Sequence, residues 1–220
     1  MNNAEILAHV DHTLLKAASK WDEVKTLCEE AVRFKTASVC VMPSYITRIA
    51  KMFTGLNICT VIGFPLGYSV SDVKVLEAKT AIFDGASEAD MVVNLGFVKN
   101  GDFGGVTREI AAVKEACGEK ILKVIIETCY LTSEEKIALC GCVTEAGADY
   151  IKTSTGFGTG GATMEDILLF KEHIGPDVKI KAAGGIRTRD DMVNFIEAGC
   201  ARLGTSSAVK ILSGEEAGTY

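Results

Sequence analysis

Short apolar runs alternate with amphipathic stretches along the whole chain. The stretches carry apolar residues at helical spacing, as in WDEVKTLCEEAVRFK (21–35) and VSDVKVLEAKTAIFDG (70–85). The runs are rich in residues that favour β-structure, and eight of them are predicted to be strands: 9–15, 37–42, 57–64, 88–95, 120–128, 148–154, 177–184 and 201–206. A strand–helix unit repeated in this way predicts a parallel sheet covered by helices.

Helix boundaries are marked by capping residues and glycines. Thr132, Thr163 and Thr188 each precede an acidic residue by three positions, which is the form of a capping box. Glycines in FDGASEAD, EAGADYI and EAGCARL fall where a helix is expected to end, shortly before the next strand. Because no proline- or serine-rich linker interrupts the repeat, we expect residues 1–220 to form one domain.

Eight strand–helix units in 220 residues predict an α/β protein with a (β/α)₈ TIM barrel, a fold that typically spans about 250 residues. A doubly wound open sheet is the alternative. No G-x-G-x-x-G motif follows the first strand, which disfavours a dinucleotide-binding sheet. In a barrel the chemistry is expected at the C-terminal ends of the strands.

Composition narrows the classes of function. The chain is 48% hydrophobic with a mean hydropathy of +0.23, which suits strands that are buried on both faces. The net charge is −6 and the 23 lysines and arginines are scattered, so neither nucleic acid nor an anionic membrane is an expected partner. No apolar run reaches the roughly 20 residues needed to span a bilayer, and we expect no signal peptide.

The eight cysteines include no C-x-x-C pair. In a chain of this length they are expected to be reduced thiols that act as small core residues, which fits a cytoplasmic protein. Cys40, in the predicted strand ASVCVM, is the one expected to approach the site. The only histidines are His9, His12 and His173. A zinc site needs three or four converging His, Cys or carboxylate ligands, and the sequence gives little support for one, so we expect no metal and no cofactor.

Two lysines stand at predicted strand ends, Lys152 in DYIKTSTGF and Lys181 in KIKAAGGIRT. Strand alternation can bring both into the barrel from adjacent strands. A lysine amine is nucleophilic only when neutral, which near pH 7 requires its pKa to fall by about three units from 10.4. Burial and a second positive charge both act in that direction, and such an amine can form a Schiff base with a carbonyl. Asp90 is the candidate proton-transfer group; alternatively, the lysines are ordinary residues that reach solvent.

The loops after the last two predicted strands are rich in glycine and serine and lead towards helix starts. Backbone N–H groups in such loops favour a phosphate, and phosphate sites after strands seven and eight are frequent in barrels. Tight packing between helix and strand is the alternative explanation. The candidate phosphate-binding residues are Gly184, Gly185, Gly204, Ser206 and Ser207.

Long stretches of the chain resemble the deoxyribose-phosphate aldolase family: VDHTLL, VIGFPLG, GASEADMVVN, KVIIET, GADYIKTSTGF, KAAGGIRT and GTSS. The resemblance covers nearly the whole length. It implies a metal-free class I aldolase on a (β/α)₈ barrel that interconverts 2-deoxy-D-ribose 5-phosphate with D-glyceraldehyde 3-phosphate and acetaldehyde.

By this resemblance Lys152 is the Schiff-base lysine, Lys181 the second lysine and Asp90 the proton-transfer group, with supporting roles for Asp11 and Lys123. The phosphate is expected at the five loop residues named above. Some members of the family carry a phosphate-binding lysine just after IKTSTG, where this chain has Phe157. The basic contact is therefore expected from Arg187 or elsewhere.

Two other functions remain open at this point. A phosphosugar isomerase or epimerase would explain the glycine loops but not the lysine pair, and a non-catalytic phosphosugar-binding module would leave both lysines unperturbed. The C-terminal Tyr220 follows a glycine-containing segment. It is either the end of a frayed polar tail, as most termini are, or a residue that assists proton transfer, as the resemblance implies. The oligomeric state is left open by the sequence, with a homodimer or homotetramer considered alongside the small phosphosugar and aldehyde partners.

Overall fold

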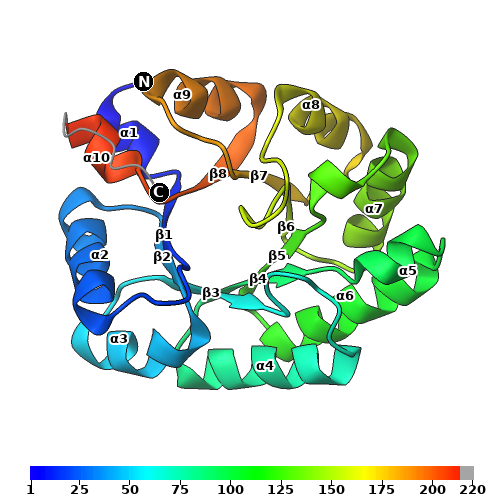
Figure 1. Cartoon of the computed structure of the whole chain (residues 1–220), viewed down its shortest axis with the longest axis horizontal. Helices are drawn as coiled ribbons and strands as arrows, with labels where there is room; N and C mark the ends of the chain where they lie inside the picture. The colour runs from blue at the N-terminus through cyan, green and yellow to red at the C-terminus, as the bar shows by residue number, and fades with distance from the viewer. Residues whose placement is uncertain (214–220) are drawn as a thin grey trace.

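The computed structural model describes residues 1–213, and its eight parallel strands close into a barrel (Figure 1). Each strand pairs with its neighbours in sequence, and the first also pairs with the last. The TIM barrel is therefore confirmed, and the open sheet is wrong. The strands are β1 Val10–Leu14, β2 Ser38–Val41, β3 Ile58–Ile62, β4 Glu88–Val92, β5 Ile121–Ile125, β6 Tyr150–Lys152, β7 Lys179–Ala183 and β8 Cys200–Thr205.

Helices form the outer ring around the strands (Figure 1). Tyr220 lies outside the described residues. The α-helices are α1 Asn3–Leu7, α2 Trp21–Phe34, α3 Ile46–Met52, α4 Ser71–Asp84, α5 Leu95–Lys99, α6 Phe103–Cys117, α7 Ser133–Glu145, α8 Met164–His173, α9 Arg189–Ala198 and α10 Ala208–Ser213. Two 3₁₀ helices, η1 Pro43–Tyr45 and η2 Thr128–Tyr130, follow β2 and β5.

The predicted caps are largely present. Thr132 and Thr188 both form complete capping boxes, whereas Thr163 accepts only the backbone N–H of the residue three positions on. Gly85 and Gly199 end α4 and α9 in the left-handed conformation that favours glycine. These local signals mark the starts of α7, α8 and α9 and the ends of α4 and α9.

A buried ion pair joins α4 to α6 outside the barrel. Lys74 Nζ lies 2.9 Å from Glu109 Oε2 and donates to the Val92 carbonyl at 2.8 Å, and both charged side chains are fully buried. Burying one charge without its partner is costly, so the pair must be kept or lost together.

We expect Glu109→Gln to lower the free energy of unfolding by about 3–5 kcal/mol, because Lys74 would be left as an uncompensated buried charge. Urea unfolding followed by circular dichroism measures the change. Glu115→Gln, at an exposed position of the same helix, is the matched control and should change stability by less than about 0.5 kcal/mol. Equal effects of the two substitutions would contradict a stabilising pair.

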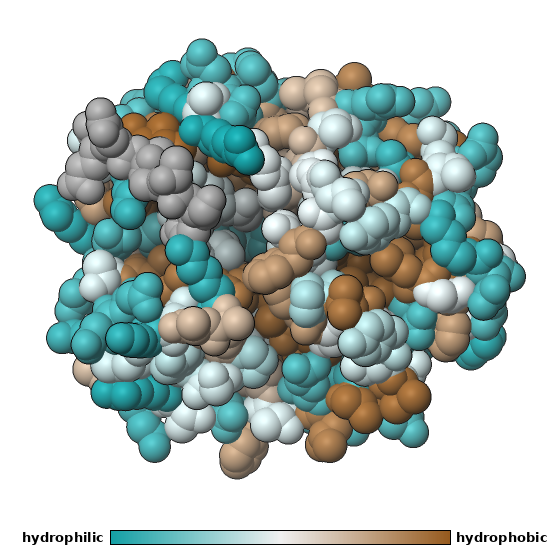
Figure 2. All heavy atoms as spheres, viewed as in Figure 1, coloured by the Kyte–Doolittle hydropathy of each residue, from teal (hydrophilic) through white to brown (hydrophobic). Residues whose placement is uncertain are grey.

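Hydrophilic residues gather mainly around the rim of the face seen in Figure 2, over the outer helices, and more hydrophobic residues lie between them. Helix α4 interrupts this polar exterior, because it exposes Leu76 and Phe83, and Phe83 is 90% exposed. Across residues 1–213 the structure contains no helix with the length and apolarity to cross a membrane.

Candidate active site

Seven ionisable side chains meet inside the barrel, and each is buried. They come from six of the eight strands, β1 and β4 to β8. Three are carboxylates and four are cations, so the cluster carries one net positive charge when all seven are ionised. The carboxylates are Asp11, Glu88 and Asp90, and the cations are Lys123, Lys152, Lys181 and Arg202.

Asp90 lies at the centre of this cluster. Its Oδ2 accepts hydrogen bonds from Lys152 Nζ and from Lys181 Nζ, both at 2.6 Å. Its Oδ1 accepts from Lys123 Nζ at 2.9 Å and from the Cys59 thiol at 3.1 Å. Lys152 and Lys181 are register partners on β6 and β7, which explains how one carboxylate oxygen can reach both amines.

The remaining carboxylates hold the cations in place from the other side. Asp11 accepts hydrogen bonds from Lys181 and Arg202, and Arg202 also pairs with Glu88 at 3.0 Å. Lys123 Nζ lies 2.6 Å from Glu88 Oε2. Each charge therefore has at least one opposite partner, which is what permits such a cluster inside a barrel.

The cluster shifts the pKa values of its members. Burial alone would raise the pKa of Asp90, but Lys123, Lys152 and Lys181 together hold that pKa well below its usual range. Burial alone would lower the pKa of Lys181, yet the carboxylates of Asp11 and Asp90 outweigh it and raise that pKa. Asp90 is therefore a carboxylate, and Lys181 an ammonium, at neutral pH.

A cavity of about 600 Å³ opens above this cluster. Lys152 connects the cavity with the charged cluster, because it lines the cavity and also contacts Asp90. All five predicted phosphate-binding residues line the cavity, as do Lys16, Phe157 and Arg187. The lining of the cavity thus combines a lysine amine with glycine- and serine-rich loops.

The glycines of this lining have different physical roles. Gly184 and Gly185 both adopt positive φ, 81° and 75°, which a residue with a side chain rarely adopts. Gly204 instead provides space, because a Cβ there would lie 3.2 Å from Lys181 Cε and 2.9 Å from Ala183 Cβ. The sequence associated Gly204 with phosphate alone, and the structure adds that it makes room for the second lysine.

The loop after Lys152 is held by a buried carboxylate that the sequence prediction missed. Glu127 accepts hydrogen bonds from both the backbone N–H and the hydroxyl of Thr155. Glu127 also has a positive φ of 55°, a strained conformation for a residue that is not glycine. Its position directly after the run KVII was the available signal, since a carboxylate at a strand end tends to lie at the barrel mouth.

The structure brings together every predicted charged site residue: Lys152, Asp90 and Lys181 in direct contact, with Asp11 and Lys123 beside them. Glu88 and Arg202 were missed, because they sit in the first half of their strands, where polar residues are easily taken for loop ends. The histidines stay apart from this cluster: His12 Nε2 lies 2.7 Å from Glu30, and His9 Nδ1 lies 3.0 Å from the carbonyl oxygen of Ala201.

A parallel eight-stranded barrel with a lysine amine on a buried carboxylate, at the edge of a cavity, is an arrangement that suits an aldolase. The comparisons with known proteins agree. Residues 6–213 match the model of the DeoC/LacD family of aldolases. The chain belongs to this family.

Similar proteins cover essentially the whole chain. A deoxyribose-phosphate aldolase from Clostridium botulinum (strain Alaska E43 / Type E3) is 63% identical over 100% of both chains. One from Clostridioides difficile (strain 630) is 57% identical, covering 98% of this chain and 99% of the relative. The solved deoxyribose-phosphate aldolase of Aeropyrum pernix, described as a unique tetramer, is 32% identical with a TM-score of 0.88, covering 97% of this chain and 92% of its own.

Proposed function

We propose that this protein is a class I deoxyribose-phosphate aldolase. It would reversibly cleave 2-deoxy-D-ribose 5-phosphate to D-glyceraldehyde 3-phosphate and acetaldehyde in the catabolism of deoxyribose phosphate. Family membership and the names of the similar proteins support the substrate. The observation that carries the proposal is the position of Lys152, in the cavity lining with its amine 2.6 Å from Asp90.

In this mechanism Lys152 is the Schiff-base residue. Its amine adds to the substrate aldehyde carbon, and loss of water gives a protonated imine. The imine draws the electron pair of the C2–C3 bond towards nitrogen as that bond breaks, and the C3 hydroxyl gives up its proton. This releases glyceraldehyde 3-phosphate and leaves an enamine. Protonation of the enamine carbon and hydrolysis of the imine then free acetaldehyde and restore the amine.

Asp90 is proposed to move the protons in these steps. Its Oδ2 touches Lys152 Nζ, so it can accept a proton as the amine attacks and return one later. Lys181 shares that oxygen and is proposed to fix its direction and to donate positive charge near the reacting atoms. Asp11 and Lys123 are positioning residues in this scheme, because they hold Lys181 and Asp90 respectively.

The substrate phosphate is proposed to lie at the opposite wall of the cavity. The proposal is supported by the cavity lining, to which the end of β8 and the loops after β7 and β8 contribute Gly184, Gly185, Gly204, Ser206 and Ser207. Two basic side chains, Lys16 and Arg187, line the same cavity and are proposed to supply the positive charge that Phe157 cannot. Phe157 instead packs edge-on against Phe64, with ring centroids 5.3 Å apart.

A coupled assay tests the proposed reaction. Incubation with 2-deoxy-D-ribose 5-phosphate should release acetaldehyde, detected as NADH oxidation by added alcohol dehydrogenase. Prior dialysis against EDTA should leave the rate unchanged, because no metal takes part in the proposed chemistry. An isomerase would convert the sugar phosphate without releasing acetaldehyde, and that result would overturn the proposal.

Ser207→Asp is expected to weaken binding of the substrate's phosphate group and to have little effect on binding of the sugar. A carboxylate at this position would repel the phosphate, and KM for deoxyribose 5-phosphate should rise at least about 10-fold. KM for unphosphorylated deoxyribose should change far less. Ser207→Asn, which has the same shape without the charge, is the matched control. Equal increases for the two substrates would place the phosphate elsewhere.

We also propose that residues 1–220 act as one catalytic domain in the cytoplasm and that copies of the chain associate. The tetrameric relative supports association, as does the apolar outer face of α4 around Leu76 and Phe83. Analytical ultracentrifugation of the protein and of a Phe83→Glu variant would test whether this face is used.

A further inference from the structure

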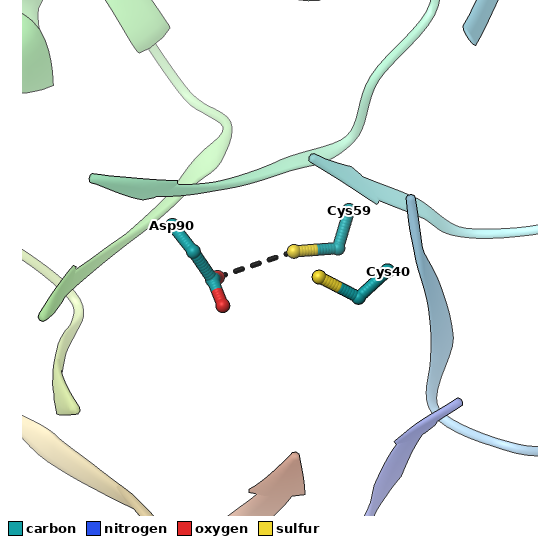
Figure 3. A group of neighbouring side chains, drawn as sticks. All are labelled: Cys40, Cys59 and Asp90. Atoms are coloured by element: carbon teal, nitrogen blue, oxygen red, sulfur yellow. Dashed lines mark hydrogen bonds between the residues drawn. The ribbon is translucent and has the colours of Figure 1, made fainter. Parts of the chain in front are cut away.

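Two cysteines and a carboxylate converge on three consecutive strands inside the barrel. Cys40 on β2 and Cys59 on β3 are register partners, and Asp90 follows on β4. One ligand atom from each lies within 4.8 Å of the other two, and all three residues are buried. Both sulfur atoms point towards the Asp90 carboxylate (Figure 3).

We propose that Cys40, Cys59 and Asp90 form an inhibitory binding site for a divalent thiophilic cation such as Zn²⁺ or Cd²⁺. The inhibitory effect rests on the proposed function, in which Asp90 transfers protons. The binding itself does not depend on it. The cation has no part in the aldolase chemistry, which the lysines and Asp90 carry out without it.

The donor atoms fit a soft d¹⁰ cation. Two thiolate sulfurs and one carboxylate oxygen are ligands that zinc uses, with a fourth position left for water. In a tetrahedral zinc site the donor atoms lie about 3.5–4 Å apart, given metal–ligand bonds of about 2.0–2.3 Å. Cys59 Sγ is already 3.1 Å from Asp90 Oδ1, so small side-chain adjustments suffice.

The charge balance of the cluster favours a cation that can displace thiol protons. Binding of M²⁺ to two thiols releases two protons, so the net charge of the buried cluster does not change. Mg²⁺ does not displace thiol protons, and it would add two charges beside Lys123, Lys152 and Lys181. The site should therefore select thiophilic cations and exclude hard ones.

The hydrogen bonds around Asp90 show how the cation can be seated. The Cys59 thiol donates to Oδ1, and a cation between these two atoms takes the place of that hydrogen. Lys123 Nζ also contacts Oδ1 and Cys59 Sγ, so the cation displaces it towards Glu88, which it already contacts at 2.6 Å. Lys152 and Lys181 bind the other oxygen, Oδ2, and can keep their contacts. A divalent charge on Oδ1 then makes the carboxylate a poorer proton acceptor, which would stop the proposed proton transfer while leaving the lysines in place.

Binding is tested first, without turnover. Metal-free protein is titrated with Co²⁺, whose thiolate complexes show a charge-transfer absorption band, and Zn²⁺ or Cd²⁺ binding is measured by equilibrium dialysis. We expect the band on Co²⁺ addition and one bound ion that Mg²⁺ does not displace. Cys59→Ser and Cys40→Ser should each weaken binding at least about 10-fold and reduce the band. Cys200→Ser is the control, since Cys200 is equally buried but packs in the core cluster that excludes Cys40 and Cys59.

Inhibition is tested second, by the rate of acetaldehyde release relative to each variant's own metal-free rate. Zn²⁺ should inhibit the parent protein and Cys200→Ser at the same concentration, and EDTA should reverse the inhibition. Inhibition of Cys59→Ser should require a Zn²⁺ concentration at least about 10-fold higher. Unchanged Zn²⁺ affinity in both Cys59→Ser and Cys40→Ser would overturn the site. Binding without inhibition would overturn its inhibitory role. Binding by a protein that releases no acetaldehyde would leave the site standing and reject the proposed function.

Discussion

Reduction with borohydride in the presence of acetaldehyde should leave a single ethyl group on Lys152 and inactivate the protein. The expectation follows from the place of this amine, which lines the cavity and is only 3% exposed, beside a carboxylate that can take its proton. Peptide mass spectrometry locates the added mass. Lys152→Arg should abolish both labelling and activity, because arginine keeps the charge near Asp90 but is not deprotonated in proteins.

The control for this experiment is another lysine of the same barrel. Lys179 lies at the exposed start of β7, two residues before Lys181, and Lys179→Gln should be labelled and active like the parent. An active protein labelled at Lys181 instead would exchange the roles of the two lysines. Turnover without any label would refute Schiff-base chemistry altogether.

The barrel was predictable because its strands are short, mostly apolar and separated by well-marked helices. All eight predicted strands are present, but most were drawn too long. The third was expected to run to residue 64, whereas β3 ends at Ile62 because Gly63 turns the chain with a positive φ of 62°. Apolar residues that line the barrel mouth look like a continuation of the strand, since the sequence does not show where pairing stops.

The charged centre was only partly predictable. Lysines at strand ends break an apolar pattern and stand out, so Lys152 and Lys181 could be identified from the sequence. Their partners come from long range: Arg202 contacts Glu88 across 114 positions in the chain, and neither residue stands out locally. The sequence placed these two lysines near each other, and the structure adds that Asp90 Oδ2 lies between their Nζ atoms.

Asp90→Asn is expected to have the second largest effect on activity, after substitution of Lys152. It removes the charge from the centre of the cluster and leaves Lys152, Lys181 and Lys123 facing a neutral amide. If Asp90 transfers protons, kcat for cleavage of deoxyribose 5-phosphate should fall by about 10²–10⁴-fold. Removing one partner from a buried ion-pair network should also lower the free energy of unfolding by about 3–5 kcal/mol. Stopped-assay kinetics and urea unfolding measure the two quantities separately.

Glu88→Gln distinguishes catalysis from stability. Glu88 belongs to the same buried network and binds Lys123 and Arg202, but no hydrogen bond or ion pair joins it to Lys152 within residues 1–213. Its substitution should cost similar stability while kcat falls much less. Exchange of solvent deuterium into the methyl group of acetaldehyde reports the proton transfer directly, and should be lost in Asp90→Asn but kept in Glu88→Gln. If both variants lose exchange and kcat equally, Asp90 acts by holding the lysines in place, and the proton must move through another group.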